Sequence, residues 1–195
     1  TWSPRNLRQA LRLYLVVGPN DTNEVSTLLK QAIAGGVTLV QWRDKKGIAS
    51  KSDVLALRRF CYGAQVPFLI NDDVALASAV SADGVHLGQD DMPTVEARAI
   101  LGDRALIGLS VGSDREAAHY DSNVVDYVGV GPLFTTKTKL DAGRALGWSN
   151  ASALLVRHKL KPCVLIGGIS PQSLKTLQDK KIPKELAGFA VVSAD

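Results

Sequence analysis

The segment FLINDDVALASAVSADGVHLGQDD, residues 68–91, holds two short apolar runs separated by a stretch with helical spacing. The runs 68–71 and 84–87 are almost wholly apolar until their last residues, which is typical of parallel strands buried on both faces. Residues 74–79 between them predict a crossover helix. The segment is therefore a strand–helix–strand unit, and acidic residues follow both of its strands.

The same alternation continues in both directions along the chain. Further strands are predicted at 13–17, 38–43, 106–110, 127–130, 163–167 and 188–192, and further helices at 23–34, 52–61, 94–101, 115–119, 150–158 and 171–178. Eight strands with short connections favour a closed (β/α)8 TIM barrel, a single α/β domain over residues 1–195, rather than an open doubly wound sheet. The final helix of such a barrel is absent from this chain. Residues 6–11 suggest an extra helix at the bottom of the barrel.

Two residues are predicted to cap the amino ends of helices. Thr94 precedes Glu96 at the start of one helix, and Ser170 stands before Pro171 at the start of another. Side-chain oxygens at such positions accept hydrogen bonds from backbone amides, and proline is favoured at the first helical position.

The composition is that of an ordinary globular protein, with 46% hydrophobic and 22% charged residues among 195. A net charge of +4 suits anionic substrates, and no stripe of basic residues interleaved with aromatics predicts a nucleic-acid partner. No apolar run approaches the roughly 20 residues that span a membrane. Cys61 and Cys163 fit no metal or redox motif, so we expect core thiols in a cytoplasmic protein.

Acidic residues follow two adjacent predicted strands, at the end of the barrel where TIM-barrel enzymes carry their active sites. Asp72 follows one strand and Asp91 the next, and neighbouring strands lie about 5 Å apart. Mg²⁺ is commonly held by one or two carboxylates together with substrate phosphates, so this pair predicts a Mg²⁺ site. Asp73 and Asp90 are the alternative ligands, and a helix-capping role is the competing interpretation.

Basic and amide side chains collect at the same end of the barrel. Arg43 and Lys45 follow the second strand, and Lys139 ends a threonine-rich loop after the sixth. These cations suit phosphate oxygens, although ordinary surface cations are the alternative. Gln41 and Asn71 stand at strand ends, where ligand binding and a satisfied buried amide are equally compatible with the sequence.

The last two strands predict a phosphate-binding cradle. Gly167 and Gly168 allow close backbone approach after the seventh strand, and Val192 and Ser193 follow at the end of the eighth. His86 ends the fourth strand, where we expect a hydrogen-bonded structural or site-lining histidine rather than a general base. No Ser-His-Asp or Cys-His arrangement is evident.

With these motifs in place, the sequence resembles the thiamine-phosphate synthase family over residues 13–194. The resemblance is carried by segments 41–45, 71–72, 84–91, 131–139, 166–169 and 191–194, and most specifically by Thr136-Lys137-Thr138-Lys139 after Gly131-Pro132. It implies a Mg²⁺-dependent transferase that joins 4-amino-5-hydroxymethyl-2-methylpyrimidine pyrophosphate to a thiazole phosphate. Pyrophosphate departs, and a carbocation-like pyrimidine remains. The thiazole nitrogen traps this cation, and thiamine monophosphate forms.

The resemblance also implies residue roles. Ligands of the pyrimidine pyrophosphate are Gln41, Arg43, Lys45, Asn71, Ser110 and Lys139; ligands of the thiazole phosphate are Thr136, Thr138, Gly168, Val192 and Ser193; ligands of Mg²⁺ are Asp72 and Asp91. Arg43, Lys45, Ser110 and Lys139 then carry the catalysis, by neutralising charge on the leaving group and by positioning.

Three alternatives stay open at this point. A thiazole tautomerase uses the same scaffold but lacks the full threonine loop and the metal pair. Another phosphate-binding barrel isomerase, such as a sugar-phosphate epimerase, would need acid and base residues at several strand ends. The third alternative is a non-catalytic binder of thiamine intermediates, against which the intact set of metal and pyrophosphate groups argues. The sequence is compatible with a homo-oligomer.

Overall fold

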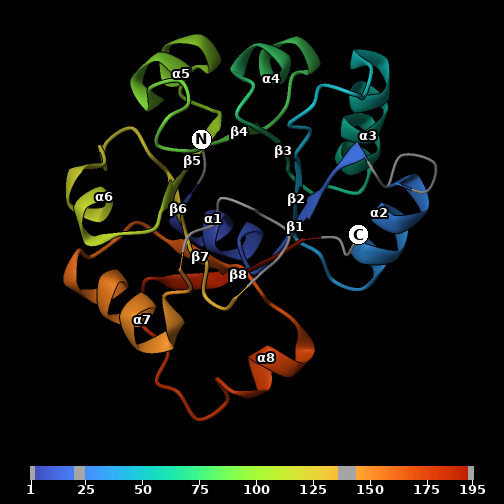
Figure 1. The fold of residues 1–195 in the computed structure, drawn as a ribbon. Helices are drawn as coiled ribbons and strands as arrows, with labels where there is room; N and C mark the ends of the chain where they lie inside the picture. The colour runs from blue at the N-terminus through green and yellow to red at the C-terminus, as the bar shows by residue number, and fades with distance from the viewer. Residues whose placement is uncertain (1–2, 20–24, 136–143, 193–195) are drawn as a thin grey trace.

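Eight parallel strands form one closed barrel in the order β1 to β8, in a computed structural model that describes residues 3–19, 25–135 and 144–192 (Figure 1). The strands are β1 Leu13–Val17, β2 Leu39–Trp42, β3 Phe68–Asn71, β4 Gly84–Leu87, β5 Leu106–Val111, β6 Tyr127–Val130, β7 Cys163–Ile166 and β8 Leu186–Val192. The predicted TIM barrel and all eight of its strands are confirmed. The largest difference is that β8 begins at Leu186 rather than at residue 188.

Within the described ranges, seven helices surround the barrel, and an eighth closes one end of it. They are α1 Pro4–Ala10, α2 Val25–Ala34, α3 Lys51–Gly63, α4 Val74–Val80, α5 Thr94–Leu101, α6 Asp114–His119, α7 Gly147–Arg157 and α8 Pro171–Lys175. Strand β8 is the last element among the described residues. None of the described helices has both the length and the apolarity that crossing a membrane requires.

The two predicted helix caps have different outcomes. Ser170 caps α8, because its hydroxyl accepts the Ser173 amide at 3.1 Å and the Ser173 side chain bonds back to the Ser170 amide. The Thr94 prediction is wrong: Pro93 holds the cap position of α5 without a side-chain hydrogen bond, and Thr94 is the first helical residue.

Alternating side chains along the strands divide the core into two layers. Inward residues such as Tyr14, Leu69 and Tyr127 fill the barrel, while outward residues such as Val40 and Val128 pack beneath the surrounding helices. Parallel strands covered by helices bury both of their faces, which explains their nearly continuous apolar runs.

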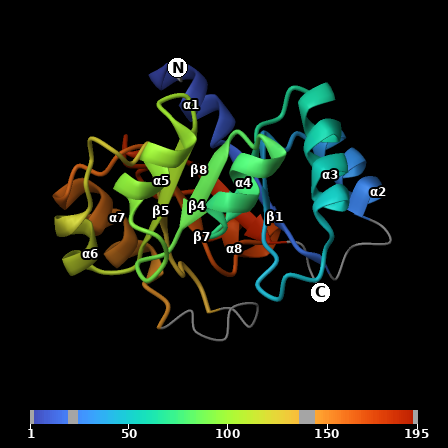
Figure 2. The ribbon, with the colours of Figure 1, turned by 90° about the horizontal axis from the view of Figure 1, so that it is seen from above.

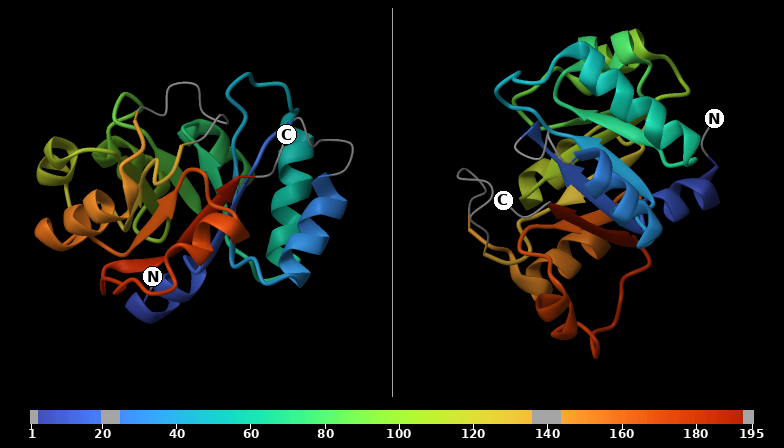
Figure 3. Two further views of the ribbon diagram at one scale, coloured as in Figure 1. Left: turned by 60° about the horizontal axis from the view of Figure 1, so that its bottom comes forward. Right: turned by 90° about the vertical axis from the view of Figure 1, so that its right-hand side faces the viewer.

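Helix α1 closes the end of the barrel at which the strands begin. Its residues Leu7 and Ala10, with Leu11 just after it, belong to the interior cluster. The Arg8 guanidinium donates to the carbonyl of Leu186, at 2.8 Å, and so ties α1 to β8. Figures 2 and 3 show α1 at this end, away from the carboxyl ends of the strands. The predicted extra helix at the bottom is confirmed, and the opposite end is left for the site.

Both cysteines are free and buried, Cys61 on α3 and Cys163 on β7. Burial raises the pKa of each thiol to about 12. Thiols in this condition are poor nucleophiles, so both belong to the core as predicted.

Candidate functional site

Two aspartates meet at the carboxyl end of the barrel, just beyond β3 and β4. The Asp72 amide donates to the carbonyl of His86 at 2.9 Å, and Asp72 has a φ of 62°, in the left-handed region that aspartate adopts more readily than most non-glycine residues. The Asp91 carboxylate accepts the Gly88 amide at 2.6 Å. The carboxyl groups of Asp72 and Asp91 lie close enough for each to shift the pKa of the other.

The electrostatics of this pair favour a bound cation. Burial raises the pKa of Asp72, and the hydrogen bond to Asp91 raises it further, although Lys45 opposes both effects. Burial alone would raise the pKa of Asp91 too, but hydrogen bonds from Asp72 and the Gly88 amide hold it below its ordinary value. Two carboxyl groups so close compete for one proton unless a cation separates them.

The neighbouring Asp73 has a different role. Its carboxylate accepts the Leu76 amide at 2.8 Å and so caps α4. The alternative interpretation of the acidic turn as a helix cap therefore holds for Asp73, while Asp72 faces Asp91.

The donor set around Asp72 and Asp91 fits a magnesium ion that shares its coordination with a substrate. Over the three described ranges, no group of three or more His, Cys, Asp or Glu side chains is arranged to hold a metal. Two carboxylates alone cannot complete an octahedral shell, and Mg²⁺ typically fills the remainder with water and substrate phosphate.

The cations predicted at the end of β2 differ in their contacts. Lys45, with its side chain 51% exposed, forms an ion pair with Asp72. Arg43 is partly buried and is anchored by its amide, which donates to the carbonyl of Val17 at 2.8 Å. Asp44 accepts the Ala49 amide at 2.9 Å and shapes the loop between β2 and α3. The structure thus brings Lys45 to the acidic pair.

A row of hydrogen bonds crosses the barrel interior from Gln41 to Ser110. Gln41 Nε2 lies 2.5 Å from the Tyr14 hydroxyl, which lies 2.8 Å from the Tyr127 hydroxyl. The Tyr127 hydroxyl lies 2.9 Å from His86 Nδ1, and His86 Nε2 lies 2.9 Å from Ser110 Oγ. The predicted hydrogen-bonded role of His86 is confirmed. The same row satisfies Gln41, which is only 4% exposed.

The two tyrosines of this row were not predicted from sequence. Tyr14 is 1% exposed and Tyr127 is 0% exposed, and burial raises the pKa of both phenols. A signal was available, because each tyrosine stands in an apolar strand and a buried hydroxyl needs a hydrogen-bond partner. The identity of the partner could not be read from the chain.

Two glycines leave the space that His86 and Tyr127 occupy. A Cβ at Gly108 on β5 would lie 2.2 Å from Tyr127 Cζ and 2.5 Å from His86 Nδ1. A Cβ at Gly129 on β6 would lie 2.9 Å from His86 Cε1. Any larger residue would displace the rings, so glycine at both positions is a condition for the row.

The loops after β6 and β7 are joined by backbone contacts. The Leu133 amide donates to the carbonyl of Ile166 at 2.7 Å, and the Phe134 amide donates to Gly167 at 3.0 Å. Gly168 has a φ of 64°, and a Cβ there would lie 2.7 Å from Phe134 Cβ. The backbone conformation and the packing therefore require glycine at position 168, independently of any ligand.

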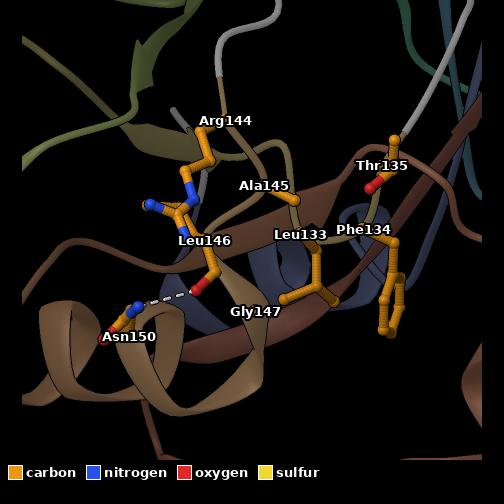
Figure 4. A pocket seen from close by; sticks show the side chains of 8 residues that line it. All are labelled: Leu133, Phe134, Thr135, Arg144, Ala145, Leu146, Gly147 and Asn150. Carbon is orange, nitrogen blue, oxygen red and sulfur yellow. Dashed lines mark hydrogen bonds between the residues drawn. The ribbon is translucent and has the colours of Figure 1, made fainter.

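A pocket of about 550 Å³ opens beside these loops (Figure 4). Its lining residues are Leu133, Phe134, Thr135, Arg144, Ala145, Leu146, Gly147 and Asn150. The side-chain amide Nδ2 of Asn150 donates to the carbonyl of Leu146 at 2.9 Å, which fixes the start of α7. The close-up shows the Arg144 and Thr135 side chains on different walls, so the pocket combines a cation and a hydroxyl with apolar surface.

The remaining predicted residues have simple outcomes. Asn71 ends β3 opposite His86 on β4, and Val192 ends β8 with 38% of its surface exposed. Thr136, Thr138, Lys139 and Ser193 lie outside the described residues.

Comparison with known proteins assigns the chain to a family. The family model described as Thiamine monophosphate synthase matches residues 13–194. A thiamine-phosphate synthase of Azorhizobium caulinodans is 45% identical over 188 residues, which cover 94% of this chain and 86% of the relative. A thiamine-phosphate synthase of Staphylococcus epidermidis is 38% identical over 192 residues, which cover 94% of this chain and 88% of the relative. The solved structure of thiamine phosphate pyrophosphorylase from Pyrococcus furiosus superposes with a TM-score of 0.79 at 32% identity, covering 97% of this chain and 89% of that one. An α/β barrel with its polar residues at the carboxyl ends of the strands, this chain belongs to the thiamine-phosphate synthase family of transferases.

Proposed function

We propose that this protein is a thiamine-phosphate synthase that joins 4-amino-5-hydroxymethyl-2-methylpyrimidine pyrophosphate to thiazole phosphate and releases pyrophosphate. The observation that carries the proposal is the neighbouring pair of Asp72 and Asp91, with Lys45 in an ion pair with Asp72, in a chain that matches the family over residues 13–194. The tautomerase alternative does not account for this acidic pair.

The pyrimidine pyrophosphate is assigned to the half of the site built by β2 to β5. Asp72 and Asp91 would hold Mg²⁺, which when bound neutralises charge on the pyrophosphate oxygens. Binding of the pyrophosphate offers Lys45 a second anionic partner besides Asp72. The other residues assigned to this substrate are Gln41, Arg43, Asn71, Ser110 and Lys139.

The thiazole phosphate is assigned to the other half of the site, after β6, β7 and β8. Gly168 offers backbone close to the loop that contains Thr135, and Val192 ends the neighbouring strand. Thr136, Thr138 and Ser193 complete the assignment. The pocket beside Arg144 lies next to the same loop and gives this half a further cation.

The reaction needs no nucleophile from the protein. The bond between the pyrimidine methylene carbon and the pyrophosphate oxygen breaks, and the electron pair leaves with the pyrophosphate. The thiazole nitrogen then supplies the pair that forms the new carbon–nitrogen bond. The task of the chain is to hold both substrates in line and to stabilise the departing anion, which are the two largest sources of catalysis in such displacements.

The test is a direct assay of both products. We expect purified protein with both substrates and Mg²⁺ to release pyrophosphate and thiamine phosphate in equal amounts. Asp91→Asn should reduce turnover by at least about 100-fold while its urea unfolding midpoint changes little, and Asp103→Asn, an exposed acid in the loop after α5, should match the wild type. Folded protein that forms neither product, or that converts the thiazole alone, would refute the proposal.

A further inference from the structure

The hydrogen-bonded row through the barrel links two residues that the proposed function places at the substrate, and the inference below rests on that function. Gln41 lies at one end of the row and Ser110 at the other, on β2 and β5. Tyr14, Tyr127 and His86 connect them from β1, β6 and β4. Five of the eight strands therefore contribute to one chain of donors and acceptors.

The first bond fixes the direction of the row on the Gln41 side. Gln41 Nε2 carries only donors, so the Tyr14 oxygen accepts. Tyr14 has one proton, and its other described partner is the Tyr127 oxygen. Tyr14 therefore donates to Tyr127, and the Tyr127 proton is left for the next residue in the row.

The direction then passes through the histidine. Tyr127 donates to His86 Nδ1, which must accept and is therefore unprotonated. A neutral imidazole with a bare Nδ1 carries its proton on Nε2, so His86 donates to Ser110 Oγ. The Ser110 oxygen thus receives a hydrogen bond from the protein and keeps its own proton for another acceptor.

We propose that this row holds Ser110 as a hydrogen-bond donor to the departing pyrophosphate, with His86 and Tyr127 as positioning residues. Ser110 is partly exposed at the carboxyl end of β5, which leaves its hydroxyl proton accessible to a substrate. A donor aimed in advance at developing negative charge stabilises the transition state without reorganisation. In the reverse orientation, Ser110 would donate to His86 and present lone pairs to the anion.

The packing around the row supports a specific geometry rather than a chance contact. Gly108 and Gly129 leave the space that His86 and Tyr127 fill, and both tyrosines are sealed from solvent. Buried polar groups are costly when unsatisfied, so a fully bonded row has one arrangement far more stable than its broken forms. This rigidity is what a positioning device needs.

The direction is measurable in the free protein by the tautomer of His86. The chain has three histidines, and the double variant His119→Gln/His158→Gln leaves His86 as the only one. Labelled with ¹⁵N-histidine at neutral pH, this protein should show a protonated Nε2 and an unprotonated Nδ1. Protonation of Nδ1 instead, of both nitrogens, or an even mixture would overturn the proposal. The readout uses no substrate, so it is independent of the reaction assigned above.

The same ¹⁵N spectrum of the Tyr14→Phe variant tests whether the hydrogen-bond direction, rather than the packing of the rings, sets the tautomer of His86. This change leaves the Tyr127–His86 bond in place but removes the donor that orients Tyr127. We expect the single tautomer to give way to a mixture. An unchanged single tautomer would show that Gln41 and Tyr14 do not set the direction.

The consequence for turnover is tested with Tyr127→Phe. We expect kcat to fall about five- to tenfold, and KM for the pyrimidine pyrophosphate to change less than about twofold, because the lost interaction acts on the transition state. Tyr120→Phe is the matched control, since its hydroxyl accepts the Lys161 amide at 3.0 Å outside the row. Equal kcat values for Tyr127→Phe and Tyr120→Phe would overturn the functional part of the inference.

Discussion

Substituting Gly108 with alanine tests how tightly the barrel interior is built around the His86–Tyr127 pair. The added methyl group would lie 2.2 Å from Tyr127 Cζ, 2.4 Å from its hydroxyl oxygen and 2.5 Å from His86 Nδ1. Each distance is far below ordinary van der Waals contact. Neither ring can move away freely, because Tyr127 is hydrogen-bonded to Tyr14 and His86 is hydrogen-bonded to Ser110.

The size of the effect follows from two contributions. Overpacking a rigid core costs about 1–3 kcal/mol. Separating Tyr127 from His86 removes one hydrogen bond, worth about 0.5–1.5 kcal/mol. We therefore expect Gly108→Ala to lower the free energy of unfolding by about 1.5–4.5 kcal/mol, a large part of the 5–15 kcal/mol typical of a domain.

Urea unfolding followed by circular dichroism measures this change, with Gly63→Ala as the matched control. Gly63 ends α3, and a Cβ there meets nothing within 4 Å. Gly63→Ala should leave stability unchanged or raise it by about 0.4–1 kcal/mol. A Gly108→Ala protein within about 0.5 kcal/mol of the wild type would refute the reasoning, because the rings would then have room to move.

Three further predictions concern other parts of the chain. Arg98 donates to the carbonyls of residues 102, 105 and 124 and forms an ion pair with Asp126 at 2.7 Å. Arg98→Ala should therefore lower the free energy of unfolding in urea by about 2–4 kcal/mol. A loss below about 0.5 kcal/mol would contradict this prediction. The pKa of Asp114 is lowered, first by its hydrogen bond to His158, so its carboxylate stabilises the fold above its unfolded pKa of about 3.9 and loses this effect as pH falls through the lower folded value. Wild type and Asp114→Asn should accordingly differ most near neutral pH and converge in acid, and a gap that widens on acidification would disprove the assignment. Lys139→Ala should reduce turnover more than stability, and full activity in the product assay would return that residue to an ordinary surface role.

The backbone could be predicted in detail because its signals are local. Strands β3, β4 and β6 have the bounds that their mostly apolar runs predict, since strands buried on both faces carry few polar residues, here Asn71 and His86 near the carboxyl ends of β3 and β4. The cap of α5 was mispredicted because the sequence allows α5 to begin either at Thr94 or one residue after it. In the structure the backbone is already helical at Thr94, so Pro93 holds the cap position.

The candidate site could be predicted only in part, because its decisive features are relations between strands. Adjacent strands placed Asp72 and Asp91 together, but the left-handed turn that separates Asp72 from Asp73 is not visible in the chain. The tyrosines remained hidden because an inward phenol in an apolar strand looks like any other core residue. Each phenol depends on hydrogen-bond partners from two other strands, and no single segment records them.

The bond between α1 and β8 has a consequence for how the protein is made. Arg8 donates to the carbonyls of Lys184 and Leu186, 176 and 178 residues further along the chain, and the first edge of β1 pairs with β8. Until these partners have been made, the growing sheet keeps an open edge at β1, and the apolar face of α1 has no barrel to close. The barrel can therefore close only after β8 has been synthesised. The interval before closure is when the nascent chain is most exposed to pairing with its neighbours and most dependent on chaperones.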